Sequence, residues 1–230
     1  MMQIICNLGP FKFMHHYQLY IFDWDGTLMN SIDKIVNSMQ YAATLADLTV
    51  PSVSQCKSII GAGMKEAADI LFPGASLASL KRLQHHYRQR FIELNSKACP
   101  LYPGTEQLIQ NLHSQGKKLA IATSKGRPGL DNVLAQSQLA RFFHTSRTAD
   151  DAKAKPHPDM LEQILAELNI NAKHAIYIGD SRFDIDMANN AGMDSIALSH
   201  GAGDIETLNA SKPTTLVHST DELTRLITCH

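Results

Sequence analysis

The chain has almost no excess charge of either sign. Lysine and arginine number 21 against 22 aspartates and glutamates, which gives a formal net charge of −1. No block of like charge stands out along the sequence. A nucleic-acid-binding surface and a polybasic membrane patch are therefore disfavoured, because both need clustered basic residues. A small diffusible ligand is the expected partner.

The chain also has few cysteines and no long apolar run. Its four cysteines are widely spaced and form no Cys-x-x-Cys pair: Cys6, Cys56, Cys99 and Cys229. This spacing disfavours a zinc site and a disulfide framework. Scattered free thiols are typical of a reducing compartment, so we predict a cytoplasmic protein. No apolar run approaches the ~20 residues that span a bilayer, so no membrane partner is expected.

The 230 residues alternate between short apolar runs and helical patterns. The apolar runs, the last of them weak, cover residues 17–22, 118–123, 175–179, 195–198 and 214–217. The helical patterns cover residues 105–115, 128–136, 158–168 and 184–191. Strands that alternate with helices predict an α/β fold, here a Rossmann-like parallel sheet with helices on both faces.

One stretch breaks this alternation. Residues 30–99 contain helical patterns and no convincing strand, and their apolar residues recur at i, i+3, i+4 and i+7. We therefore predict a discontinuous α/β core at 14–29 and 100–230, with an all-helical cap inserted at 30–99. Residues 1–13 are predicted to be an N-terminal extension that the fold does not need, because the first strand begins just after Met14.

The first strand runs into the acidic segment Asp23-Trp24-Asp25-Gly26-Thr27. Side chains alternate along an extended chain, so Asp23 and Asp25 point to one side. Two carboxylates this close repel each other, which raises one pKa unless a cation lies between them. Gly26 lets the backbone turn tightly, and the amides after the strand can face an anion. Taken alone, the segment is also compatible with a plain acidic turn.

Three further strand ends or loops carry polar side chains. The second strand ends in Thr123 and Ser124, whose hydroxyls can donate to a phosphoryl oxygen or cap a helix. Lys155 lies in a later loop, where a lysine can pair with phosphate or simply be solvated. The fourth strand runs into Asp180 and Asp184; such carboxylates suit Mg²⁺, and the second also suits the first turn of a helix. Because ligands bind at the carboxyl ends of parallel strands, these side chains are predicted to meet.

Together, these motifs resemble those of the haloacid dehalogenase superfamily. The resemblance rests on four motifs in order: Asp23-x-Asp25-Gly26-Thr27, then Thr123 or Ser124, then Lys155-Pro156, then Gly179-Asp180-x-x-x-Asp184. It covers residues 17–230, and the helical segment is similar to the small, C1-type cap of that family. The tail from Ser199 to Leu226 resembles the phosphoglycolate phosphatase branch.

The resemblance implies a catalytic role for four of these residues. Asp23 would be the nucleophile and Asp25 the general acid/base. Thr123 would hold the phosphoryl group, and its neighbour Ser124 is the alternative for that role. Lys155 would neutralise the phosphoryl charge.

The resemblance also implies Mg²⁺ as the cofactor. Its ligands would be the carboxylates of Asp23 and Asp180 and the backbone carbonyl of Asp25, and Asp184 would support this shell. Three residues are implied to contact the substrate: Gly26, Thr27 and Ser124.

Residue 25 narrows the expected reaction. Relatives that dehalogenate acids lack an aspartate there, as phosphonate-cleaving relatives usually do, so Asp25 favours hydrolysis of a phosphate ester through an aspartyl phosphate. A phosphomutase similar to β-phosphoglucomutase, or a pyrophosphatase on the same fold, is the alternative. Segment 60–66 is mostly small and apolar, which is more typical of phosphatase caps. A binding protein without turnover would need a broken motif, and none of the four is broken.

We therefore predict a phosphatase of a small phosphorylated metabolite, with phosphoglycolate as one candidate. The cap residues carry no readable code for the substrate, and the sequence gives no indication of the oligomeric state.

Overall fold

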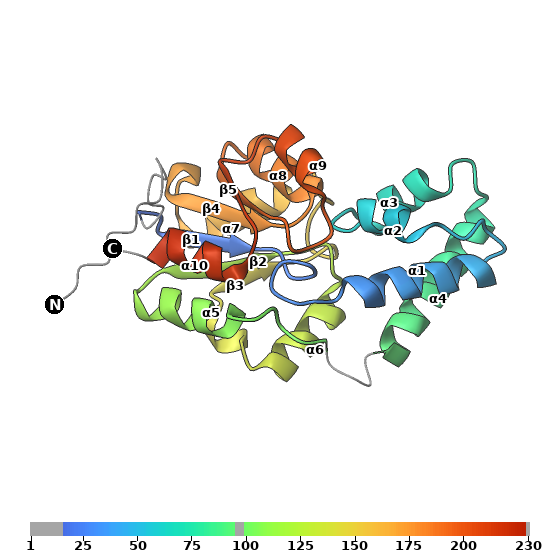
Figure 1. Cartoon of the computed structure of the whole chain (residues 1–230), viewed down its shortest axis with the longest axis horizontal. Coiled ribbons are helices and arrows are strands. Elements are labelled where there is room, and N and C mark those ends of the chain that lie inside the picture. Colours follow the sequence, from blue (N-terminus) through green and yellow to red (C-terminus); the bar gives the residue numbers. More distant parts are fainter. Residues whose placement is uncertain (1–15, 95–98, 229–230) are drawn as a thin grey trace.

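The computed structural model describes residues 16–94 and 99–228, so the predicted extension at 1–13 lies outside the described residues. Its centre is a six-stranded sheet in the order β3-β2-β1-β4-β5-β6, in which every pairing is parallel (Figure 1). The strands are β1 Leu19–Phe22, β2 Lys118–Ala122, β3 Thr145–Arg147, β4 Ala175–Gly179, β5 Asp194–Leu198 and β6 Thr215–Val217. The predicted parallel α/β fold is confirmed.

The central strand β1 is buried on both faces, which explains why its sequence is a continuous apolar run. Alternate side chains enter different cores. Leu19 and Ile21 pack with residues of α7 (Asp159–Leu168) and α8 (Arg182–Asn190). Tyr20 and Phe22 pack on the opposite face, with residues of α5 (Thr105–Ser114), α6 (Arg127–Ser137) and α10 (Thr220–Thr228).

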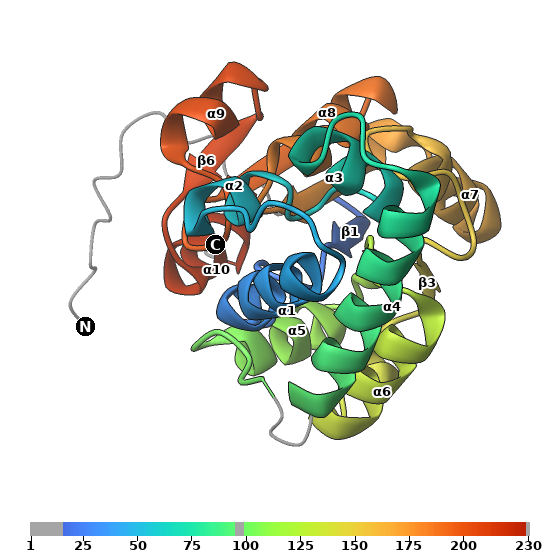
Figure 2. The ribbon, with the colours of Figure 1, turned by 90° about the vertical axis from the view of Figure 1, so that its right-hand side faces the viewer.

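The segment between β1 and β2 forms a separate group of helices. These are α1 Ile32–Leu45, α2 Val53–Ser58, α3 Met64–Leu71 and α4 Leu77–Glu93. They enclose their own apolar core, and they lie beyond the carboxyl end of β1, as the two perpendicular views show (Figures 1 and 2). We call these four helices and the segments that join them the cap. No strand occurs in the described part of residues 30–99, although the boundaries of the cap stay predictions.

The chain enters and leaves the cap through two segments that lie side by side. The amide of Asn30 donates to the carbonyl of Pro100, and the amide of Tyr102 donates to the carbonyl of Leu28, both at 2.9 Å. This pairing ties the cap to the strand that carries the acidic motif. Across the described residues, no helix combines the length and apolarity needed to cross a membrane.

Several elements were not predicted from the sequence. Strand β3 consists of Thr-Ser-Arg at the sheet edge and lacks the apolar run that marks a buried strand. The other unpredicted elements are short: α2, α3, α9 (Ile205–Ala210), α10 and two 3₁₀ turns at Ala140–Phe142 and Ala172–His174.

Candidate active site

The end of β1 places Asp23 at the carboxyl edge of the sheet. Its amide donates to the carbonyl of Ile178 on β4 at 2.9 Å, which continues the strand pairing by one residue. The chain then turns through Gly26, whose φ of +84° lies in the left-handed region that favours glycine. Trp24 points away into the core and is fully buried.

Three carboxylates meet at this edge: those of Asp23, Asp180 and Asp184. One oxygen from each lies within 4.8 Å of the other two, and all three residues are buried. Burial raises the pKa of Asp23 to about 6, even though the neighbouring Lys155 lowers it. Burial and the other two carboxylates also raise the pKa of Asp180 well above its ordinary range. Three carboxylates therefore face a single lysine ammonium, which does not balance their negative charge. Their oxygen atoms are the ligands that a divalent cation such as Mg²⁺ prefers, so the cluster fits such an ion.

Lys155 lies within this cluster and is completely buried. Its ammonium lies 2.7 Å from Asp184 Oδ1 and 2.9 Å from Tyr177 Oη, both as hydrogen bonds. It also lies 2.9 Å from Asp23 Oδ1. That last contact is an ion pair without good hydrogen-bond direction, because Asp23 Oδ1 accepts no hydrogen bond from the described residues. An oxygen of Asp23 therefore keeps a lone pair available for a further positive partner.

The charge of Lys155 is maintained by its neighbours. Burial alone lowers the pKa of a lysine, but the carboxylates of Asp184 and Asp23 raise the pKa of Lys155 above its ordinary value. The prediction that this loop lysine meets the acidic residues is therefore supported by the geometry, and its alternative as a solvated lysine is wrong.

Asp180 is held by the segments on either side of it. Thr27 Oγ1 donates to Asp180 Oδ1, and the amide of Ala202 donates to Asp180 Oδ2, each at 2.7 Å. A Cβ atom added at Gly26 or at Gly201 would lie 2.2 Å from Asp180 Oδ2. Gly26 and Thr27 thus fit closely around Asp180, and their predicted contact with the substrate stays a prediction.

Asp184 lies in the first turn of α8, as expected. Ser181 and Asp184 form a reciprocal capping box at the start of this helix. Asp184 Oδ2 accepts from both the amide and the hydroxyl of Ser181, while Oδ1 faces Lys155 and Tyr177. Asp184 therefore caps α8 with one carboxylate oxygen and joins the acidic cluster with the other. Its expected place in the first helical turn and its expected place near the metal site are compatible.

Asp25 lies slightly apart from the cluster and keeps some exposure. Ser31 Oγ donates to its Oδ1 at 2.6 Å, and the Lys125 ammonium lies 2.8 Å from its Oδ2. Neither partner was assigned a role from the sequence. Lys125 directly follows Thr123-Ser124 at the end of the second strand, and this position was the only feature of the sequence that could have indicated a role for it in the site. The two contacts fix the orientation of the carboxylate toward the cavity between cap and core.

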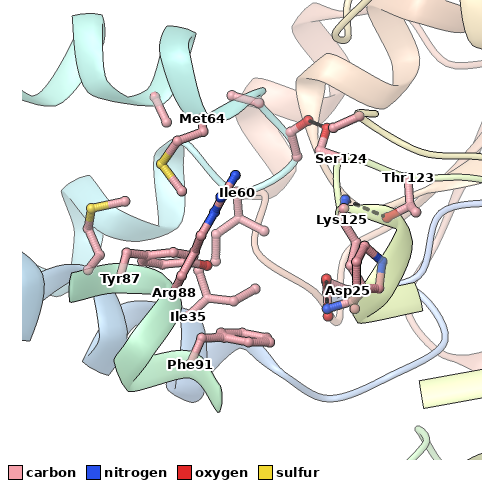
Figure 3. A pocket seen from close by; sticks show the side chains of 18 of the residues that line it. Asp25, Ile35, Ile60, Met64, Tyr87, Arg88, Phe91, Thr123, Ser124 and Lys125 are labelled. Atoms are coloured by element: carbon pink, nitrogen blue, oxygen red, sulfur yellow. Dashed lines mark hydrogen bonds and ion pairs between the residues drawn. The ribbon is translucent and has the colours of Figure 1, made fainter. Parts of the chain in front are cut away.

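The two hydroxyl residues after β2 have different surroundings. Thr123 is buried and, like Asp23 and Asp25, lines the cavity. Figure 3 shows Thr123 and Asp25 on the core side of this cavity. Ser124 also lines the cavity, but its hydroxyl donates to the carbonyl of Gly61 in the cap at 2.7 Å. Of the two, Thr123 is the better placed to bind a phosphoryl group, and Ser124 links the core to the cap.

Tyr177 is a site residue that sequence reasoning missed. It is fully buried on β4, donates to the carbonyl of Ala122 at 2.8 Å, and lies 2.9 Å from both Lys155 Nζ and Asp184 Oδ1. Inside an apolar strand a tyrosine resembles any core residue, so no signal in the sequence distinguished it.

Comparison with known proteins agrees with this geometry. The family model described as "Haloacid dehalogenase-like hydrolase" matches residues 20–198. A phosphoglycolate phosphatase of Vibrio cholerae is 28% identical over 212 residues, which cover 87% of this chain and 92% of that protein. The pyrophosphatase PpaX of Bacillus mycoides is 28% identical over 194 residues, which cover 84% of this chain and 88% of that protein. A hydrolase from Pseudomonas syringae has a crystal structure with a TM-score of 0.83 and 22% identity, covering 90% of this chain and 95% of that chain.

The chain belongs to the haloacid dehalogenase-like hydrolases, because the family model matches well over half of its length. The family predicted from the four motifs, and with it the prediction of a hydrolytic enzyme, is confirmed.

Proposed function

We propose that this chain is a magnesium-dependent phosphatase that hydrolyses a small phosphorylated metabolite through an aspartyl phosphate on Asp23. The observation that carries the proposal is the buried group of Asp23, Asp180 and Asp184 around Lys155, with Asp25 next to it. The relatives named phosphoglycolate phosphatase support the same class of reaction.

Each residue has a defined part in the first step. A carboxylate oxygen of Asp23 attacks the phosphorus, and the bond from phosphorus to the ester oxygen breaks. Asp25, in its protonated form, gives its proton to the departing oxygen. Thr123 donates a hydrogen bond to a phosphoryl oxygen, and Lys155 offsets the charge that builds up on the phosphoryl group.

The second step restores the enzyme. Asp25, now a carboxylate, takes a proton from water, and the resulting hydroxide attacks the phosphorus of the aspartyl phosphate. The bond between phosphorus and Asp23 breaks, inorganic phosphate leaves, and the Asp23 carboxylate is free again. Ser31 and Lys125 hold Asp25 in place for both transfers.

The group that would hold Mg²⁺ consists of Asp23, Asp180, the backbone carbonyl of Asp25 and, in support, Asp184. When bound, the ion supplies positive charge that offsets the repulsion between a phosphate ester and the attacking carboxylate. Proposed ligands Asp180 and Asp184 are already fixed by Thr27, Ala202 and Ser181.

A pyrophosphatase is the second candidate, because the relative PpaX matches most of this chain. The same steps would serve pyrophosphate, with a phosphate as the leaving group. A phosphomutase would instead return the phosphoryl group to a second sugar hydroxyl.

A phosphate-release screen with purified protein distinguishes these functions. The panel contains phosphoglycolate, sugar phosphates, an aryl phosphate and pyrophosphate, each with Mg²⁺ and with excess chelator, and Asp23→Asn serves as the inactive control. We expect Mg²⁺-dependent release of inorganic phosphate from a monoester. An isomerised sugar phosphate would indicate the mutase, and full activity under exhaustive chelation would refute the proposal.

A further inference from the structure

A cavity of about 1080 Å³ separates the cap from the carboxyl edge of the sheet. Its core side carries Asp23, Asp25 and Thr123, where the phosphoryl group is proposed to bind. Cavities of ~300–1,000 Å³ hold drug-sized ligands, so this one has room for far more than a two-carbon acid. The chemistry of its cap side therefore indicates what the rest of the substrate looks like.

The cap side of the cavity is mostly apolar. Helices α1 and α3 and the segment after α2 contribute Ile35, Met39, Ile59, Ile60, Met64 and Ala67. All of these except Met64 are buried members of the apolar core of the cap, so the wall is fixed by packing. Apolar substrate atoms would gain affinity against this wall, whereas a carboxylate pressed against it would lose its hydration without compensation.

Helix α4 adds two aromatic rings to this wall. Tyr87 and Phe91 lie one turn apart and stack, with ring centroids 5.9 Å apart and an interplanar angle of 24°. The Lys125 ammonium lies 4.7 Å from the centre of the Phe91 ring and 2.8 Å from Asp25 Oδ2. The aromatic wall thus begins beside the carboxylate that protonates the departing oxygen (Figure 3), and the atoms bonded to that oxygen would meet it first.

The cavity lining contains two basic side chains, Lys125 on the core side and Arg88 on the cap side. Lys125 already forms an ion pair with Asp25. A second anionic group close to the phosphoryl group would therefore lie beside the Asp25 carboxylate and would compete with it for Lys125. Arg88, from the cap, also lines the cavity and forms no ion pair or hydrogen bond with the described residues. Figure 3 shows it extending from α4 toward the segment that carries Ile60. Its guanidinium is therefore placed to meet an anionic substituent away from the phosphoryl group.

We propose, given the phosphatase function above, that the alcohol part of the substrate is an apolar group containing a ring. The ring packs against Tyr87 and Phe91, and any anionic substituent lies at its far end, next to Arg88. Phosphoglycolate, whose carboxylate is one carbon away from the ester oxygen, would be a poor substrate.

The test compares kcat/KM, with Mg²⁺, for benzyl phosphate, ethyl phosphate and phosphoglycolate. All three release an alkyl alcohol, so the comparison reports mainly on contacts of the alcohol part. Each buried methylene is worth about a fourfold gain, so we expect benzyl phosphate to exceed ethyl phosphate by at least about tenfold. Phosphoglycolate should not exceed ethyl phosphate.

Variants then identify the contacts. Phe91→Ala should lower the benzyl-to-ethyl ratio about tenfold, the loss of one well-packed aromatic contact. Leu77→Ala is the matched control, because Leu77 is 78% exposed on the same helix and does not line the cavity. Arg88→Gln should selectively reduce kcat/KM for 4-carboxybenzyl phosphate relative to benzyl phosphate.

Binding measurements separate this inference from the proposed function. Calorimetry with Mg²⁺ compares benzylphosphonate and ethylphosphonate, which a phosphatase of this type does not cleave. If no ester is hydrolysed but benzylphosphonate binds at least tenfold more tightly, the phosphatase proposal fails and the substrate inference stands. If esters are hydrolysed but phosphoglycolate is preferred, or the two phosphonates bind equally, the inference is wrong and the phosphatase proposal stands.

Discussion

The charge on Asp23 should destabilise the folded protein when no cation is bound. Burial raises the pKa of its carboxyl from 3.8 to about 6, despite the opposing effect of Lys155. Because the folded state then binds this proton more tightly than the unfolded chain does, the free energy of unfolding falls as the pH rises through this range. A pKa difference of this size corresponds to about 3 kcal/mol at neutral pH and above. Neutral Asp23→Asn should avoid this cost while keeping the side-chain shape.

In the presence of a chelator, we expect Asp23→Asn to be more stable than the wild type by about 3 kcal/mol at neutral pH and by little near pH 4. For a chain of this length, that difference raises Tm by roughly 6–12 °C. Urea unfolding of both proteins across this pH range measures the difference directly. Part of the difference comes from Asp180, because the Asp23 carboxylate helps to raise the pKa of Asp180 in the wild type only. Added Mg²⁺ should stabilise the wild type more than the variant.

A stability difference that does not change with pH would refute this reasoning. So would a wild type that is the more stable protein at neutral pH under chelation. Either result would mean that the carboxylates are satisfied without a cation.

Four further predictions concern turnover and metal binding. Asp25→Asn should reduce kcat on an alkyl phosphate ~10²–10⁴-fold but much less on an aryl phosphate, whose leaving group needs little protonation; steady-state rates on both esters check this. Tyr177→Phe removes a hydroxyl bonded to Lys155 and should lower kcat about tenfold with little change in KM, with thermal unfolding as the control. Gly201→Ala places a Cβ 2.2 Å from Asp180 Oδ2 and should weaken Mg²⁺ binding at least about tenfold in a calorimetric titration. Ca²⁺ should support activity poorly, because it takes more and longer oxygen bonds; equal rates with Ca²⁺ and Mg²⁺ would contradict the proposed metal site.

The sheet and its acidic edge could be predicted because local patterns determine them. A strand buried on both faces, such as β1 or β4, must be a continuous apolar run, and its carboxyl end then marks the site. The meeting of Asp23 and Asp180 follows from this rule, and Asp184 joins them because α8 begins directly after the end of β4. Edge strand β3 is only partly buried and follows no such pattern.

Other features of the site depend on contacts that no local pattern encodes. No local pattern indicated that the hydroxyl of Thr27 donates to Asp180, which lies 153 positions later. From the sequence alone, Lys125 could equally remain in solvent. Its contacts with Asp25 and with the Phe91 ring form only when α4 of the cap lies next to the core. The cavity wall likewise combines residues from separate helices of the cap, so its apolar character emerges only when they fold together.

The central position of β1 has a consequence for how the protein is made. Its partners β2 and β4 begin at Lys118 and Ala175, so β1 is synthesised roughly 100 residues before its first neighbour and roughly 150 residues before its second. At ~5–20 residues per second, this wait lasts roughly 8–30 s on a ribosome. The cap helices emerge during that interval and can pack on one another, while the apolar β1 strand still lacks both neighbours. An early strand of this kind is a natural client for chaperones, and the carboxylates of Asp23, Asp180 and Asp184 cannot come together until the second half of the chain has been translated.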